Sequence, residues 1–282
     1  MTLQTHRIGD ITRGINAPNL VCRICGNTKG NTVYHVRDMM FGYRDEFAYF
    51  QCSSCECLQI NAFPSDMTRY YLSQYYSFVL INQREQPKEI MSQVSSYAQS
   101  YKNSYAAFGR GVVGRILYAL SPNPTARERL RTLLRESFPP GDLENLGITP
   151  NSSLLDVGCG SGSRLLGLYG AGFRTLGGID LYIESDTHYE NGVQVLKRTI
   201  HEISGSWDVI MFHHSFEHLS DQVETIRSVA RLLSKNGLCI IRIPTVTSYA
   251  WENYKEHWVQ LDAPRHFYLH SIKSMQLLAT RL

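Results

Sequence analysis

The sequence of 282 residues lacks any uninterrupted apolar run that approaches the length of a membrane span. Its first ten residues are mostly polar and lack the apolar centre of a secretory signal peptide. Basic residues barely outnumber acidic ones, with 28 Lys and Arg against 25 Asp and Glu, and they are scattered rather than gathered in a stripe. These absences predict a cytoplasmic protein without a membrane span, and they disfavour nucleic acid as a partner.

Four of the seven cysteines form two Cys-x-x-Cys pairs, Cys22 with Cys25 and Cys52 with Cys55. The connector between the pairs is long enough for a small β-hairpin, which would bring four thiolates round one tetrahedral zinc ion. Cys57 follows as a spare candidate ligand. Disulfides are disfavoured because no secretory signal is present, and a redox motif would need one pair on a thioredoxin-like unit. The pattern therefore predicts a structural zinc site, since four sulfur ligands leave no open coordination position.

The glycine-rich segment after residue 157 has the context of a cofactor loop. An apolar, β-forming run ends at Val157, the glycines Gly158, Gly160 and Gly162 alternate after it, and helix-friendly spacing resumes at Ser163. Glycine permits the positive φ angles of a tight turn and the close approach of a ligand to the backbone. A plain glycine-rich turn between a strand and a helix is the alternative.

The spacing within this loop separates two classes of cofactor. A dinucleotide fingerprint places its third glycine where this chain has Ser163, whereas here the third glycine is Gly162 and Asp156 precedes the first one. This disfavours NAD. A second short strand over residues 175–179 ends in Asp180, which we expect to bind a ribose, with a solvated acid at a strand end as the alternative.

Four segments in order resemble class I S-adenosylmethionine-dependent methyltransferases: LDVGCGSG, GIDL, WDVIMFHHSFEHL and KNGLCIIRIP. The resemblance covers residues 147 to the C-terminus. It implies an α/β fold with a doubly wound, Rossmann-like sheet of seven strands, helices on both faces and ligands at the carboxyl ends of the strands. It also implies S-adenosylmethionine as cofactor, and the expected cofactor-binding residues are Asp156, Gly158, Cys159, Gly160, Gly162, Asp180 and His213.

The cysteine-rich region resembles the zinc-binding front end of bacterial methyltransferases from polysaccharide and sugar-modification pathways, in segments 37–42, 57–60 and 70–71. This resemblance implies O-methylation of a sugar in a surface-polysaccharide or nucleotide-sugar pathway, with a small molecule or glycan as acceptor. A sugar C-methyltransferase is one alternative. A non-catalytic, zinc-anchored interaction module with a vestigial cofactor fold is the other.

Methyl transfer to a hydroxyl requires alignment of the acceptor and removal of its proton. His213 and His214 directly follow the expected fourth strand, and a histidine that is neutral suits the role of base. The resemblance favours His214 as the base, and His266, in the segment WVQLDAPRHFYLH, is the second candidate. Packing or helix capping is the alternative role for these histidines.

The chain is expected to comprise a zinc-ribbon-like module over residues 1–64, a helical linker rich in aromatic residues over 65–146 and a methyltransferase domain over 147–282. In the linker, Tyr97, Tyr101 and Tyr105 recur at helical spacing and predict a packing stripe. After a predicted helix that begins at Ser271, the last two strands of the family are missing, so the chain is interpreted as C-terminally truncated. The pattern leaves the oligomeric state open.

Overall fold

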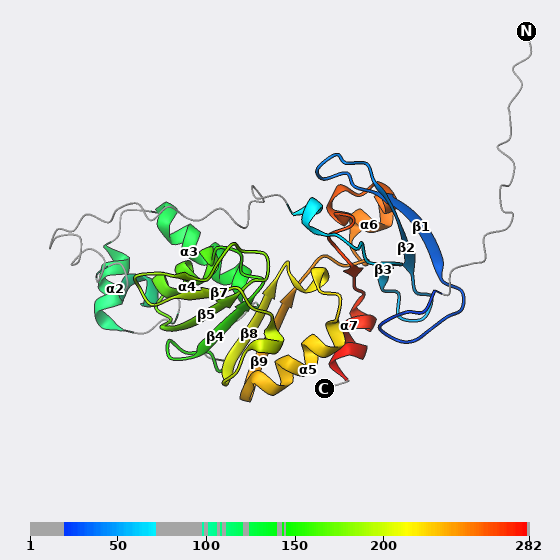
Figure 1. Cartoon of the computed structure of the whole chain (residues 1–282). Helices are drawn as coiled ribbons and strands as arrows, with labels where there is room; N and C mark the ends of the chain where they lie inside the picture. Colours follow the sequence, from blue (N-terminus) through cyan, green and yellow to red (C-terminus); the bar gives the residue numbers. More distant parts are fainter. Residues whose placement is uncertain are drawn as a thin grey trace, which may run out of the picture.

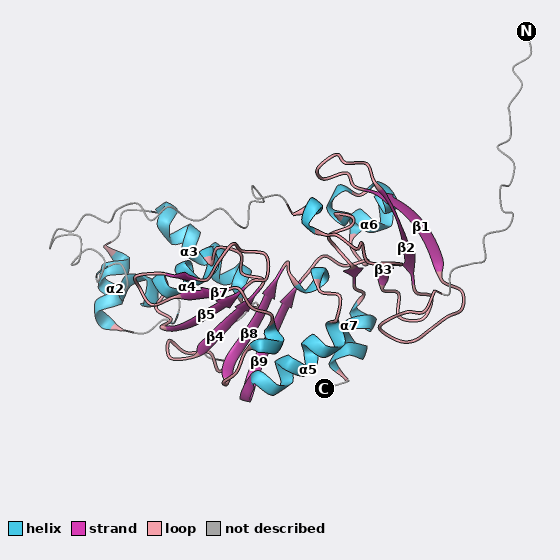
Figure 2. Cartoon of the chain, in the orientation of Figure 1, coloured by secondary structure: helices cyan, strands magenta, loops and turns pink. Residues whose placement is uncertain are grey.

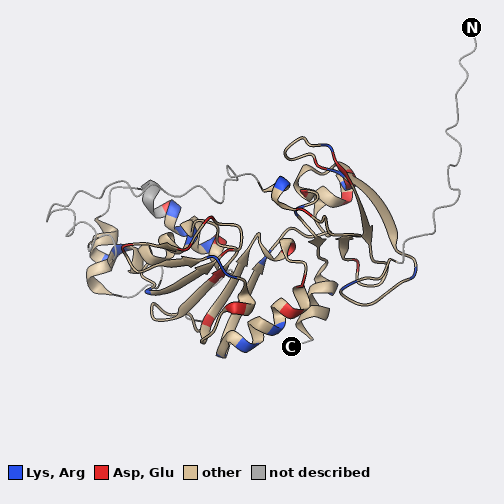
Figure 3. Ribbon diagram, in the orientation of Figure 1, with Lys and Arg blue, Asp and Glu red and all other residues tan. Residues whose placement is uncertain are grey.

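A computed structural model describes residues 20–71, 98, 101–105, 108, 111–120, 124–139, 143 and 145–280 of the chain. These residues form two sheets with helices packed around them (Figures 1 and 2). Charged residues of both signs are distributed over the described elements (Figure 3). Within these ranges, no helix combines the length and apolar character needed to cross a membrane.

The larger sheet has six strands in the order β6-β7-β5-β4-β8-β9. All its pairings are parallel except that of β6 with β7. The strands are β4 (Ser153–Val157), β5 (Thr175–Ile179), β6 (Thr187–His188), β7 (Gln194–Leu196), β8 (Trp207–His213) and β9 (Leu233–Arg242). Within this sheet, β4 comes first along the chain and β5, β7 and β6 lie on one side of it. The chain then returns to β8 on the other side of β4, so the strand order reverses between β4 and β8. Ligands of doubly wound sheets bind at such a reversal point.

Helices cover both faces of this sheet, as expected for a doubly wound fold (Figure 1). They are α3 (Pro124–Ser137) and α4 (Ser163–Gly170) on one face and α5 (Gln222–Leu232) and α7 (Ile272–Ala279) on the other. Helix α2 (Val112–Ala119) lies beyond the end of the sheet and packs against Tyr105 (Figure 1). The helix predicted after Ser271 is α7, and the Ser271 side chain caps it by accepting a hydrogen bond from the Ser274 backbone. Of the predicted aromatic stripe, Tyr97 lies outside the described residues, Tyr101 is 58% exposed, and the Tyr105 ring lies 5.7 Å from that of Tyr118 in α2.

The two faces of the sheet belong to two different cores because alternate side chains of a strand point to opposite faces. Leu154 and Met211 pack in one core with residues of α3 and α4. Leu155 and Phe212 pack in the other core with α5, and that core continues into the cysteine-rich front of the chain.

The smaller sheet is built from both ends of the chain. Strands β1 (Thr32–Arg37), β2 (Glu46–Gln51) and β3 (Leu58–Ile60) form an antiparallel meander, and β10 (Tyr268–Leu269) pairs with β3 as the fourth strand. Figure 1 shows the orange and red C-terminal segment against this blue front sheet. The domain boundaries 1–64, 65–146 and 147–282 remain predictions. The structure adds that a strand of the third segment completes the sheet of the first.

Candidate functional site

The glycine loop lies between β4 and α4, at the reversal point of the larger sheet. Gly158 and Gly162 have φ angles of 75° and 80°, in the left-handed region that favours glycine. A Cβ atom at Gly158 would lie 2.4 Å from the Cβ of Ser215, and one at Gly162 would lie 2.6 Å from Val195 Cγ2. The loop is therefore held against β7 and against the segment that follows β8 at distances that only glycine allows.

Asp180 follows β5 and lies directly beside the glycine loop. Its carboxylate accepts hydrogen bonds from the backbone N–H groups of Gly160 (2.9 Å) and Tyr182 (2.8 Å). Burial raises the pKa of this carboxyl, while these two hydrogen bonds act in the opposite direction. Asp180 therefore fixes the conformation of the loop through Gly160, and it is also the residue that we expect to bind a ribose. The loop is further tied to β5 by a hydrogen bond from the Cys159 N–H to the Ile179 carbonyl (3.2 Å).

Asp156 is a buried carboxyl group in β4, with 2% of its surface exposed. Burial is the main cause that raises its pKa to about 7, with a further contribution from the charge of Asp180 and an opposing one from Arg164. Its Oδ1 atom has no hydrogen-bond partner among the described residues. A buried acceptor without a donor is costly, so this oxygen is suited to a donor group on a ligand.

His213 is the last residue of β8. Burial, together with the positive charges of Arg164 and Arg242, lowers its pKa to about 3, so the imidazole is neutral near pH 7. Within the described part of the chain, neither ring nitrogen has a hydrogen-bond partner. Like Asp156, this residue offers an unused polar group near the carboxyl end of a central strand.

The two candidate bases, His214 and His266, approach the same carboxylate. Glu217 Oε1 lies 3.6 Å from His214 Nδ1 and 3.9 Å from His266 Nε2. The side chain of His214 is 56% exposed, whereas that of His266 is 11% exposed. The pKa of His266 lies well below its ordinary value, mainly because of burial and secondarily because of His218 and Arg265. His214 also has a φ angle of 53°, which is uncommon for a residue with a side chain.

Glu217 is a central residue that the sequence analysis did not name. It lies in the 3₁₀ helix η3 (Phe216–His218), has no exposed side-chain surface, and neither of its carboxylate oxygens accepts a hydrogen bond from a described residue. The sequence signal was an acid four residues after the end of β8, between Phe216 and His218. We call His214, Glu217, His218, Asp262 and His266 the histidine cluster.

The front sheet holds the C-terminal side of the histidine cluster in place. The buried guanidinium of Arg265 forms ion pairs with Asp38 (2.9 Å) and Asp262. Tyr49 donates a hydrogen bond from its hydroxyl to the His266 carbonyl (2.8 Å), and the Phe267 N–H donates to the Glu217 carbonyl (2.9 Å). The position of His266 therefore depends on residues more than 200 positions earlier in the chain.

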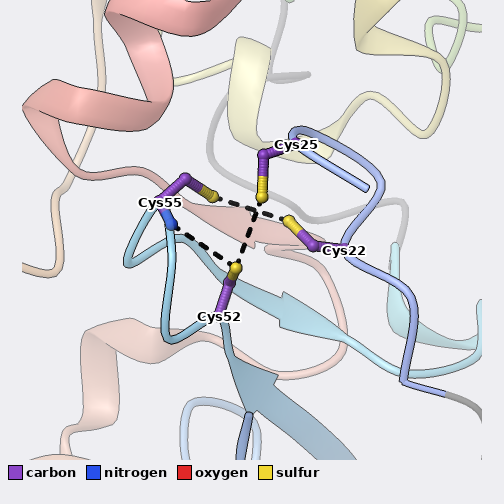
Figure 4. Close-up of side chains that lie close together, drawn as sticks. All are labelled: Cys22, Cys25, Cys52 and Cys55. Atoms are coloured by element: carbon purple, nitrogen blue, oxygen red, sulfur yellow. Dashed lines mark hydrogen bonds between the residues drawn. The ribbon is translucent and has the colours of Figure 1, made fainter. Parts of the chain in front are cut away.

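The four predicted zinc ligands converge in the front sheet (Figure 4). The Sγ atoms of Cys22 and Cys55 are 3.5 Å apart, as are those of Cys25 and Cys52, and all four lie within 4.8 Å of one another. A zinc ion with Zn–S bonds of about 2.3 Å holds its four sulfurs about 3.8 Å apart, so the arrangement fits a tetrahedral site. Cys57 is buried but is not part of this cluster.

Backbone and side-chain groups around the cysteines are placed to donate to sulfur. The N–H groups of Ser54 and Cys55 point to the Cys52 sulfur at 3.4 and 3.5 Å, and the Gln59 amide donates to the Cys22 sulfur at 3.1 Å. Such donors stabilise thiolate ligands.

The model of the methyltransferase domain family matches residues 123–282, which is more than half of the chain. Among solved structures, the plantazolicin methyltransferase BpumL in complex with SAH is 21% identical, with a TM-score of 0.43 over 67% of this chain and 78% of that one. The YcgJ protein of Bacillus subtilis is 18% identical, with a TM-score of 0.39 over 49% and 64%. The cyclopropane synthase MmaA2 of Mycobacterium tuberculosis is 14% identical, with a TM-score of 0.40 over 64% and 74%.

A search of curated proteins found no significant match. The structural similarities are too low to carry an argument about substrate, and the chain spans 64% of YcgJ and 78% of BpumL. The family match is independent of them, and it includes the glycine loop, Asp180 and the histidine cluster. The chain therefore belongs to the methyltransferase domain family, and its larger sheet has the Rossmann-like order of the class I, S-adenosylmethionine-dependent members.

Proposed function

We propose that the chain is an S-adenosylmethionine-dependent methyltransferase that methylates a hydroxyl oxygen of a sugar. The observation that carries the cofactor assignment is the pair of hydrogen bonds from the Gly160 and Tyr182 N–H groups to the Asp180 carboxylate. They place the acid beside a turn whose glycines could not carry a Cβ atom without a clash. Support for a sugar comes from the resemblance of the front region to sugar-pathway methyltransferases. A cluster of imidazole and carboxylate groups also suits recognition of several hydroxyls.

The residues of the site fit S-adenosylmethionine in chemistry. Asp180 offers carboxylate oxygens for ribose hydroxyls, and Asp156 Oδ1 is a buried acceptor without a donor, which suits an ammonium group. Gly158 is exposed at the turn, and the three glycines adopt the positive φ angles that the turn requires. When bound, the cofactor supplies an electrophilic methyl group.

The remaining tasks belong to the acceptor side, where a hydroxyl must be oriented and its proton accepted. His214 is the proposed base because its ring is half exposed and Nδ1 lies 3.6 Å from Glu217 Oε1, which can orient the ring. His266 is the second candidate, but its burial makes proton uptake less favourable. The four cysteines would bind a structural zinc ion that holds the front sheet.

Replacing Asp180 by Ala is expected to weaken binding of S-adenosylhomocysteine roughly tenfold to a hundredfold, because charge-assisted hydrogen bonds to the ribose are lost. Part of the loss should come from the loop, since Asp180 also holds Gly160. Isothermal titration calorimetry measures the affinity, and Glu190→Ala, an exposed acid near β7, is the control. Unchanged affinity in Asp180→Ala would remove this residue from the cofactor site.

Cofactor affinity should also depend on the charge of Asp156. This carboxyl has a pKa of about 7, so it is mostly neutral at pH 6 and mostly charged at pH 8. If it accepts from the cofactor's ammonium group, affinity should rise by up to roughly tenfold between about pH 6 and pH 8. Titrations at several pH values test this, and Asp156→Asn should flatten the profile. A wild-type profile that is already flat, or that falls with pH, would contradict the assignment.

Activity itself is tested by supplying radiolabelled S-adenosylmethionine with candidate nucleotide sugars and locating the methyl group by NMR. An O-methyl product supports the proposal. A methyl group bonded to carbon would assign a sugar C-methyltransferase, and absence of cofactor binding would favour a non-catalytic interaction module.

A further inference from the structure

We propose that Glu217, His218 and His266 bind a divalent first-row metal cation, at a site separate from the four cysteines. One ligand atom from each of these residues lies within 4.8 Å of those of the other two. Two imidazoles and one carboxylate form a common donor set for such cations. Cation binding does not depend on methyl transfer. The role given below to the cation in activating an acceptor hydroxyl rests on the proposed function.

The burial of the Glu217 carboxylate favours a cation beside it. The carboxylate has no exposed surface, and neither oxygen accepts a hydrogen bond within the described ranges. Among the described Lys, Arg and His side chains, the nitrogens within 4.0 Å are those of His214 at 3.6 Å and His266 at 3.9 Å, both beyond hydrogen-bond distance. A buried carboxylate requires compensation by donors or by positive charge. A cation at this point supplies that compensation.

The hydrogen bond of His218 sets its ring tautomer as in a metal ligand. The His218 Nδ1 atom lies 2.8 Å from the carbonyl oxygen of Arg265 and donates a hydrogen bond to it. A donor at Nδ1 leaves the lone pair of Nε2 free for a ligand. This is the arrangement that fixes the tautomer of metal-ligating histidines in proteins, where the second ring nitrogen donates to a carbonyl or carboxylate.

The position of His266 and the charged groups around it also favour a cation. The His266 Nε2 atom lies 3.9 Å from both Glu217 Oε1 and Asp262 Oδ2. Asp262 already forms an ion pair with Arg265, which also pairs with Asp38. These three charged groups sum to one negative charge, and Glu217 adds a second. The surroundings therefore favour a divalent cation.

The distances allow coordination after a small adjustment. Metal–nitrogen and metal–oxygen bonds of about 2.0–2.2 Å place neighbouring ligand atoms about 3.4 Å apart in a tetrahedral site. The 3.9 Å separation of Glu217 and His266 exceeds this by an amount that side-chain rotation can close. Three protein ligands leave a coordination position open, where an acceptor hydroxyl would bind and become more acidic, close to His214.

The test uses the full chain with zinc at its cysteines and Co²⁺ as the added probe. Calorimetry and metal analysis should show one further bound equivalent, with a cobalt spectrum that lacks the thiolate charge-transfer band of a cysteine site. Glu217→Gln and His266→Ala should each weaken this second equivalent by at least roughly tenfold, while the control His188→Ala, an exposed histidine on β6, should not. Retention of zinc at the cysteines confirms that each variant keeps its front sheet.

Failure of the wild-type protein to bind a second equivalent overturns the proposal, as does unchanged cobalt affinity in both variants. If a variant does not fold, the test is NMR of the wild-type protein, in which bound Co²⁺ should broaden the ring signals of His218 and His266. Absence of this broadening counts against the site. S-adenosylhomocysteine binding is measured in parallel without cobalt. A negative cobalt result with intact cofactor binding therefore rejects the metal site and leaves the methyltransferase proposal standing.

Discussion

Cys25→Ser is expected to abolish the zinc site at the four cysteines and to unfold the front sheet. Structural zinc contributes roughly 10–16 kcal/mol to the folding of small zinc peptides at pH 7, which is comparable to the whole stability of an ordinary domain. The front sheet has only short strands, of three to six residues over β1–β3, and its cysteines are part of its packed core. Metal analysis and hydrogen exchange over β1–β3 measure the effect.

The consequence should extend to the histidine cluster. β10 pairs with β3, Tyr49 binds the His266 carbonyl, and Asp38 binds Arg265, so loss of the front sheet removes the partners of residues 265–269. Catalytic turnover should therefore fall with the zinc. The glycine loop and Asp180 belong to the other sheet, so affinity for S-adenosylhomocysteine should fall much less.

Cys57→Ala is the control because Cys57 lies in the same sheet region and is more buried than Cys25, but it is not one of the four clustered thiols. It should keep its zinc and lose only the stability associated with a small buried side chain. Metal-free wild-type protein with a fully protected front sheet would contradict the structural role of zinc.

His214→Ala is expected to lower turnover roughly 10²- to 10⁴-fold, the usual contribution of a positioned general base. Affinity for the cofactor should change little, because the substitution removes a half-exposed ring beside Glu217 and leaves Asp180 and Asp156 in place. Single-turnover kinetics and calorimetry with S-adenosylhomocysteine separate the two quantities. Added imidazole should restore part of the activity, because the exposed position gives a small base access to the vacated space.

The control for this substitution is His201→Ala, an exposed histidine that pairs with Asp221 away from β8. Full activity in His214→Ala would exclude His214 as the base. Loss of activity in His266→Ala would then place the base in the segment before β10 only if that variant keeps its cobalt affinity, because His266 is also a proposed metal ligand. Full activity in both would show that the acceptor needs no base from either position.

The sequence by itself determined the arrangement of the glycine loop and Asp180, the part of the molecule that we propose binds the cofactor. The strand, the three glycines and the following helix are consecutive in the sequence. Asp180 directly follows β5, which pairs in parallel with β4, so the geometry of adjacent parallel strands places this acid beside the loop. The two Cys-x-x-Cys pairs likewise converge through a single β-hairpin. In both cases short connections leave the chain few other ways to arrange these residues.

Only the tertiary structure decided how the two parts meet. The pairing of β3 with β10 joins residues more than 200 positions apart, and a strand of two residues has no periodicity from which such pairing can be read. His214 lies only three residues before Glu217, but the imidazole of His266 reaches Glu217 from the distant segment before β10, which the sequence did not indicate. Contacts between distant segments depend on the packing of the whole fold. For this reason the cofactor loop was predictable from local pattern, whereas the histidine cluster and its support by the front sheet were not.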